Sequence, residues 1–190
     1  MTSSQTSAML LGALVADAAS LGVHWIYDPE RIAEIAARRG GQSSFTPVDA
    51  ANYKDIKGYF AHVLRGSGMP TQYGEVLRLT IQSMNANDGA FDVASFQAAF
   101  AAHFGPGGTY LGYIDRPTRA ALDNIAAGQS PSGIDDDQNP AVARLPAIFA
   151  GYHDKGTLSE MIVTAMQVTN VNDVAAGYNA AFADVLDRVA

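Results

Sequence analysis

The chain has 190 residues, of which 48% are hydrophobic and 16% are charged. This composition suits one folded domain with a single core and argues against disorder. The formal net charge is −7, so nucleic acids and anionic membranes are not expected partners, because both favour a basic surface. The absence of cysteine excludes disulfides, thiolate metal sites and cysteine nucleophiles.

The N-terminal segment is apolar but does not resemble a targeting sequence. No lysine or arginine precedes Arg31, whereas a secretory signal begins with positive charge. Asp17 interrupts the apolar run short of the roughly 20 residues that span a bilayer. We therefore expect a cytoplasmic protein without a membrane segment.

The first predicted helix begins after Ser7 or a nearby serine or threonine and ends near Gly22. Its apolar residues recur at helical spacing, and Asp17 lies on or beside that stripe. A carboxylate there needs hydrogen bonds or a cation. It either holds the N-terminus of a neighbouring helix, which the spacing alone favours, or borders a cleft.

Four further helices are predicted from their N-terminal caps, and a fifth short helix is predicted over residues 59–64. Residues 42–58 are polar and indicate a loop. In the helix that follows Asp92, Phe96, Phe100 and Phe104 recur at spacings of four and indicate core packing. The four capping residues are Asp28, Thr71, Asp92 and Asp115.

The C-terminal third predicts three more helices. The first opens at Asn139 and is kinked by Pro146, and the second follows a capping-box pattern at Thr157. The last runs from Val171 to about Leu186 behind Asn170 as its cap. Its residues Val174, Tyr178, Ala181 and Val185 share one side.

The chain therefore predicts an all-α fold of eight or nine helices, because no convincing alternating strand pattern occurs. No internal repeat, low-complexity tract or linker divides residues 1–190, so we expect one domain.

Two polar stretches are candidate ligand sites. The first contains three adjacent carboxylates and two amides, and it equally suits a solvated loop that ends in a helix cap. It lacks the spacing of a calcium loop. The second, Gly107 and Gly108, would let a ligand approach the backbone closely but is equally a plain turn. The first stretch consists of Asp135, Asp136, Asp137, Gln138 and Asn139.

The four histidines are His24, His62, His103 and His153. No two of them are four residues apart, so a histidine metal site has little support.

Two segments resemble a known family. Residues 12–18, GALVADA, resemble the opening motif of the ADP-ribosylglycohydrolase superfamily, and residues 22–28, GVHWIYD, are similar to its J1-crystallin branch. Residues 139–144, NPAVAR, resemble the segment that contacts ADP-ribose in that family. The resemblance implies an orthogonal multi-helix bundle and covers the N-terminal part of the family's chain.

Departures from the family pattern concern the metal site. The family's Thr-Asp-Asp-Thr motif corresponds to residues 71–74, TQYG, and its early glutamate corresponds to His24. Pro140 replaces a glycine and removes one N–H that would contact phosphate. The family uses magnesium, but the first acidic motif is replaced and the second is absent, so no metal ligand is assigned.

The resemblance implies an enzyme that hydrolyses an N- or O-glycosidic bond of ADP-ribose or a related nucleotide sugar. His24 would be the acid/base and Asp17 would orient the site. Residues 135–139, Arg144 and the two glycines Gly107 and Gly108 would hold the substrate.

The alternative is a non-catalytic J1-crystallin-like protein, or a binder of a small ADP-ribose-like molecule that has lost magnesium. A chain resembling only part of the family would also expose apolar helix faces, which predicts a homodimer.

Overall fold

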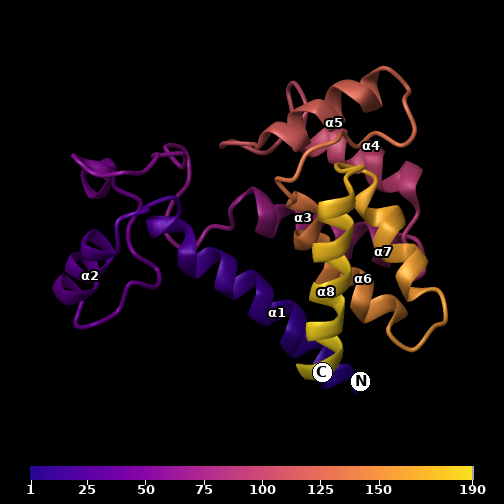
Figure 1. The fold of residues 1–190 in the computed structure, drawn as a ribbon, viewed down its shortest axis with the longest axis horizontal. Helices are drawn as coiled ribbons and strands as arrows, with labels where there is room; N and C mark the ends of the chain where they lie inside the picture. The colour runs from indigo at the N-terminus through magenta and orange to yellow at the C-terminus, as the bar shows by residue number, and fades with distance from the viewer. Residues whose placement is uncertain (190) are drawn as a thin grey trace.

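The computed structural model describes residues 1–189, which form eight α-helices and three short 3₁₀ helices with no strand (Figure 1). The all-α prediction is confirmed. The elements in chain order are α1 (Ser3–Ser20), η1 (Leu21–Val23), α2 (Pro29–Arg38), η2 (Ala50–Tyr53), α3 (Gln72–Ala86), α4 (Val93–Phe104), α5 (Arg116–Ala126), η3 (Pro140–Arg144), α6 (Leu145–Tyr152), α7 (Leu158–Met166) and α8 (Asp173–Val189).

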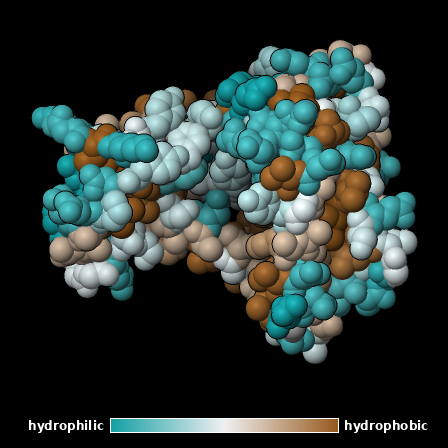
Figure 2. All heavy atoms as spheres, in the orientation of Figure 1, coloured by the Kyte–Doolittle hydropathy of each residue, from teal (hydrophilic) through white to brown (hydrophobic). Residues whose placement is uncertain are grey.

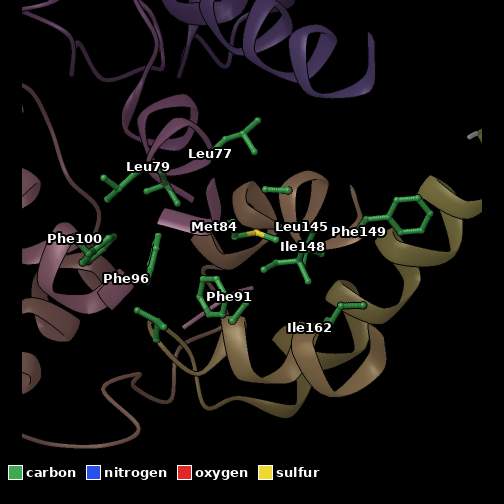
Figure 3. Packing of buried hydrophobic residues seen from close by; sticks show 14 of the residues in the cluster. Leu77, Leu79, Met84, Phe91, Phe96, Phe100, Leu145, Ile148, Phe149 and Ile162 are labelled. Carbon is green, nitrogen blue, oxygen red and sulfur yellow. The ribbon is translucent and has the colours of Figure 1, made fainter. Parts of the chain in front are cut away.

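Helix α3 is the centre of the core. Nine of its 15 residues are buried, and α1, α4, α6 and η3 pack against it. Figure 3 shows side chains of α3, α4, α6 and α7 meeting in this core. The phenylalanine row of α4 is part of it, as predicted, since Phe96 and Phe100 are both fully buried.

The segment 21–70, which carries η1, α2 and η2, lies to one side of the other helices (Figure 1). None of its residues belongs to the main hydrophobic cluster. Figure 2 shows the surface hollowed between this segment and the rest of the molecule. At the joint between the two parts, Asp17, His24 and Tyr73 are partly exposed, whereas His62, Thr71 and Gln72 are buried.

Most predicted caps are confirmed. Asp28, Thr71, Asp92 and Asp115 each accept a hydrogen bond from a backbone amide in the first turn of the helix that follows. The first helix begins earlier than predicted, because Thr2 rather than Ser7 forms a capping box with Gln5.

Three predicted caps are wrong. Neither Asn139 nor Thr157 makes a side-chain capping bond. Asn170 is fully buried, and the start of α8 is instead capped by Asn172, which accepts from the Ala175 amide at 3.0 Å.

Two other local predictions need correction. Residues 59–64 form no helix and are irregular, with a turn at residues 63 and 64. The predicted kink at Pro146 is a change of helix type, because η3 ends at Arg144 and Pro146 lies in the first turn of α6, where a missing N–H is harmless.

Helix α1 is mostly exposed to solvent although most of its residues are apolar. Only one of its 18 residues is buried. Within the described residues, Ser3–Val23 is the one helical stretch long and apolar enough to cross a membrane by length and composition, with 17% of that window buried. Most of the α1 surface is therefore exposed within residues 1–189, although Met9, Leu10, Ala13 and Leu14 pack against the core.

Removing a core side chain tests the packing around α3. Ile148 is fully buried, so Ile148→Ala should lower the free energy of unfolding by about 2–5 kcal/mol through lost burial and a residual cavity. Leu111, 62% exposed, is the control, and Leu111→Ala should change stability by less than about 0.5 kcal/mol. Urea unfolding measures both, and equal effects would contradict the packing.

Candidate functional site

Asp17 joins the end of α1 to the start of α3. One carboxylate oxygen accepts from the Thr71 amide at 2.7 Å and the other from the Thr71 hydroxyl at 2.6 Å. A Cβ on Gly74 would overlap this carboxylate, so a glycine is required there. Burial raises the pKa of Asp17, and the Thr71 hydrogen bonds oppose the rise. Asp17 therefore holds the N-terminus of α3, and it also lines a cavity described below.

His24 lies next to Asp17 and pairs with His62, a residue that sequence reasoning left unassigned. Nδ1 of His24 and Nε2 of His62 are 2.7 Å apart. Burial lowers the pKa of both imidazoles, that of His62 to about 4. His62 is 2% exposed. The two rings therefore form a neutral hydrogen-bonded pair at pH 7. Because the two histidines are 38 residues apart in the chain, their pairing cannot be predicted from a local sequence pattern.

A group of three aromatic rings adjoins His24 through Trp25. The Trp25 ring centroid lies 4.7 Å from that of Tyr113, 5.6 Å from that of Tyr59 and 4.8 Å from that of His24. Trp25 has a backbone φ of 67°, which is unusual for a bulky residue and is typical of functional sites. Together the rings form a partly exposed aromatic surface beside two imidazoles.

The start of α3 is occupied by neutral side chains that are already hydrogen-bonded. The Gln72 amide donates to the Thr118 hydroxyl at 2.8 Å and accepts from the Asp115 amide at 2.6 Å. The Tyr73 side chain interacts with the side chains of Gln138 and Asp115. Burial and the Asp115 charge raise the pKa of Tyr73. Tyr73 therefore links the Asp17 region to the predicted ligand loop.

That loop is mostly organised by internal contacts. Asp136 is buried, and it accepts from Arg116 at 2.7 Å and from the Gln138 amide at 2.9 Å. Asp135 accepts from Asn172 at 2.6 Å, whereas Asp137 is exposed. Of the predicted ligand residues in this loop, Gln138 is thus the one that reaches the Asp17 region through Tyr73.

Asn139 faces α8 rather than the candidate site. Its amide nitrogen donates to the Asn179 side chain at 3.1 Å and to the Ala175 carbonyl at 3.3 Å. The contacts that the structure gives Asn139 are therefore those of a structural residue.

Arg144 is completely buried in the core. Its guanidinium donates to the Ala165 carbonyl at 3.0 Å and to the Thr169 hydroxyl at 3.1 Å, and it lies over the Phe96 ring at 5.4 Å. Burial lowers the pKa of Arg144 to about 9. A ligand cannot reach this side chain without opening the core.

Gly107 and Gly108 lie in a turn that folds back on the end of α4. The Gly108 amide donates to the Gly105 carbonyl and the Tyr110 amide to the His103 carbonyl, both at 2.9 Å. Gly107 has a φ of 76°, which glycine adopts without strain. These contacts describe a plain turn and do not join it to His24.

The residues present do not fit magnesium, which needs several hard oxygen ligands. Both oxygens of Asp17 already accept hydrogen bonds from Thr71, and Asp115 caps α5. Across residues 1–189 no group of three or more acidic or histidine side chains is arranged to hold a metal ion. We therefore derive no step through a metal.

A cavity of about 160 Å³ opens beside these groups. Asp17 and Ala13 of α1, Tyr73 of α3, Val142 of η3 and Phe182 of α8 contribute to its wall. It is smaller than the roughly 300–1,000 Å³ of typical ligand pockets, so a nucleotide-sized molecule would lie mostly outside it.

A larger cavity of about 350 Å³ lies between α7 and α8, where Ile162 and Ala183 are among its lining residues. It contains none of the predicted site residues.

Comparison with known proteins identifies the relatives of this chain. The ADP-ribosylglycohydrolase family profile matches residues 2–190. The chain is 28% identical to Crystallin J1A and 27% identical to Crystallin J1B, both from Tripedalia cystophora. Each alignment covers 97% of this chain and 58% of the relative, so the chain spans less than two thirds of their length. No solved structure shows significant similarity.

Removing the Asp17 carboxylate should destabilise the protein. Asp17→Ala leaves the Thr71 amide and hydroxyl without their acceptors, which should cost about 2–3 kcal/mol of unfolding free energy. The exposed Asp154 provides the control, since Asp154→Ala should stay within about 0.5 kcal/mol of the parent. Urea unfolding compares the two, and an unchanged Asp17→Ala protein would show that these bonds contribute nothing.

The buried imidazole predicts a pH dependence. Since the pKa of His62 is about 4 in the folded state and about 6.5 when unfolded, the unfolded state binds more protons between these values. Stability should therefore be complete above pH 6.5 and fall as the pH decreases toward 4. His62→Gln should flatten this decline in urea unfolding, whereas His153→Gln should not. Parallel pH profiles for His62→Gln and the parent would refute this role.

Proposed function

Because the chain belongs to the ADP-ribosylglycohydrolase family, we propose that it binds an ADP-ribose-like small molecule without magnesium. The observation that carries this proposal is the start of α3. There the Gln72 side chain is hydrogen-bonded within the protein, Tyr73 interacts with Gln138 and Asp115, and His24 of the neutral histidine pair lies 6.1 Å from the Tyr73 ring. The Gln72 amide is already satisfied, so recognition would come from the partly exposed rings of His24 and Tyr73 rather than from metal coordination.

The aromatic surface supports a ligand with a flat ring. Trp25, Tyr59 and Tyr113 lie close together, and Tyr59 is 57% exposed. Aromatic side chains stack on planar groups and add about 0.5–1.5 kcal/mol per pair beyond burial. Arg119 lies over Tyr113 at 5.9 Å and would add positive charge next to this surface. A molecule that combines a planar base with anionic groups matches both features.

The small cavity limits how much of the ligand is enclosed. At about 160 Å³ it accommodates a fragment, so most contacts would come from the exposed rings and the joint between segment 21–70 and α3. Modest affinity is the expected consequence, because water is incompletely excluded from such a site.

Hydrolysis of a glycosidic bond is the second candidate. The observation that favours it is the 2.7 Å contact between His24 and His62, through which a proton could pass to or from a leaving group. Glycosidases typically use two carboxylates. Asp17 has both oxygens engaged by Thr71 and would at most orient His24. Binding is therefore the better-supported function, and a J1-crystallin-like role without catalysis is compatible with it.

A thermal-shift titration with ADP-ribose tests the proposal. At a hundredfold excess over Kd a ligand stabilises the folded state by about 2.7 kcal/mol, which should raise the midpoint by roughly 5–11 °C. The rise should be equal with magnesium and with EDTA. Trp25→Ala should weaken binding about tenfold, and His153→Ala should leave it unchanged.

The other outcomes separate the candidates. A shift that requires magnesium would contradict the metal-free site, and the absence of any shift would contradict ligand binding. Release of ADP-ribose from an ADP-ribosylated substrate, abolished by His24→Ala but retained in EDTA, would establish the hydrolase.

A further inference from the structure

The strongest feature outside the candidate site is a threonine hydroxyl that contacts an imidazole, which in turn contacts a carboxylate. Nδ1 of His103 lies 2.7 Å from the hydroxyl oxygen of Thr109. Nε2 of the same ring lies 3.3 Å from a carboxylate oxygen of Glu75. A nucleophile within hydrogen-bond distance of a base that a third group orients is the arrangement of nucleophilic catalysis. These three residues are here termed the Thr109 cluster.

The fold brings the cluster together from two helices and a loop. Glu75 lies in the first turn of α3 and His103 in the last turn of α4, and the two helices pack against each other. The loop after α4 folds back on that helix, because the Tyr110 amide donates to the His103 carbonyl at 2.9 Å. A Cβ on Gly108 would overlap the same carbonyl, so glycine permits this close approach. Thr109 is thereby held at the His103 ring.

Two arginines keep Glu75 ionised. Arg65 donates to one carboxylate oxygen at 2.9 Å and Arg78 to the other at 2.6 Å. Burial alone would raise the pKa of Glu75, but the hydrogen bonds and charges of Arg78 and Arg65 lower it. An ionised carboxylate only accepts hydrogen bonds, so the proton of the imidazole lies on Nε2. Nδ1 of His103 is then the acceptor for the Thr109 hydroxyl.

The imidazole is a neutral base at pH 7. Burial lowers the pKa of His103, the charge of Glu75 opposes this, and the charges of Arg78 and Arg65 lower it further. The ring of Tyr110 also lies against His103, with 5.9 Å between the ring centroids. The groups that surround His103 therefore leave Nδ1 unprotonated and able to take the threonine proton.

The nucleophile is accessible whereas its base is shielded. Thr109 is exposed, but the side chains of His103 and Glu75 are each 11% exposed. The two arginines outnumber the one carboxylate, and 41% of the Arg78 side chain is exposed. An anionic reactant is therefore attracted to this point of a chain whose net charge is −7.

We propose that Thr109 is a nucleophile that accepts an acyl group from an acyl phosphate. The threonine Oγ1 bonds to the carbonyl carbon, and the bond between that carbon and the phosphate oxygen breaks. The hydroxyl proton passes to Nδ1 of His103 and from there to the departing phosphate. The products are a threonine ester and inorganic phosphate, so no oxidant or reductant is required.

The class of donor follows from the groups around the cluster. Arginine does not release its proton in proteins, so Arg65 and Arg78 attract an anion but supply no proton to a leaving group. A donor whose leaving group departs as a stable anion needs no second acid. An acyl phosphate has both properties, because it is anionic and its leaving group is phosphate.

Incubation of the intact chain with acetyl phosphate, followed by peptide mass spectrometry, tests the proposal. Thr109 should gain one acetyl group at least about 100-fold faster than Thr157, given the usual effect of a positioned base. Thr157 is also exposed and makes no side-chain capping bond, so it is a control within the same molecule. Hydroxylamine should remove the acetyl ester from Thr109 but leave acetylated lysines intact.

The variants separate nucleophilic activation from simple exposure. His103→Gln should slow acetylation of Thr109 by about 100-fold, whereas Thr109→Ser should retain the ester and His153→Gln should react like the parent. Far-UV circular dichroism verifies that each variant is folded. The comparison with Thr157 in the parent chain needs no variant.

The pH profile provides a second readout. The rate at Thr109 should be constant above about pH 6.5 and decrease at lower pH, because protonation of His103 removes the acceptor for the hydroxyl proton. Attack assisted by hydroxide alone would instead become faster throughout the range.

Two results would support the proposal and two would overturn it. Accumulation of the Thr109 ester supports it, and so does repeated phosphate release that is lost in both Thr109→Val and His103→Gln, since the ester is then hydrolysed as it forms. Equal rates at Thr109 and Thr157 without such release, or a folded His103→Gln variant that reacts like the parent, would overturn it. None of these readouts involves ADP-ribose, so they leave the proposed function untouched.

Discussion

A buried guanidinium organises the core of this protein. Moving Arg144 out of water costs several kcal/mol, and the structure offsets this cost by surrounding the charge on several sides. The Ala165 carbonyl and the Thr169 hydroxyl accept its hydrogen bonds. The rings of Phe96 and Phe100 lie against it, and the Asp115 charge opposes the fall of its pKa. Helices α4 and α7, the start of α5 and η3 must therefore assemble together, because a partial assembly would remove the few partners of a guanidinium whose Nε and Nη2 already make no hydrogen bond.

Hydrogen bonds and side-chain contacts connect the core around Arg144 to the candidate site. Asp115 donates its amide to Gln72 at the start of α3, and the next α3 residue, Tyr73, contacts Gln138. Thr71, one residue earlier, is held by Asp17 of α1. The position where the family pattern has metal-binding acids is thus a structural junction here. Carboxylates at Gln72 and Tyr73 would disrupt the same contacts that connect α1, α3 and α5.

The helices were predictable because their signals are local. The cap residues Asp28, Thr71, Asp92 and Asp115 act within their own first turns, so sequence alone reveals them. Asn170 failed as a predicted cap because its side chain bonds across the structure, to the carbonyls of Asp136 and Gln138. Capping residues and buried asparagines have the same local pattern, and only tertiary packing distinguishes them.

The site itself was only partly predictable. Asp17 could be assigned a role because an acid on an apolar stripe needs partners. His62 could not, since its pairing with His24 depends on how segment 21–70 folds back. Arg144 was assigned to ligand binding from its motif, whereas its complete burial makes it part of the core. Motif resemblance therefore located these segments without determining which side chains face solvent.

The position of Trp25 has an optical consequence. It is the single tryptophan of the chain, and its ring lies within 5 Å of the rings of His24 and Tyr113. Fluorescence excited selectively at tryptophan therefore comes from one indole at the candidate site. Changes of solvation or protonation around His24 alter the emission of the whole protein, so the natural sequence contains its own spectroscopic reporter.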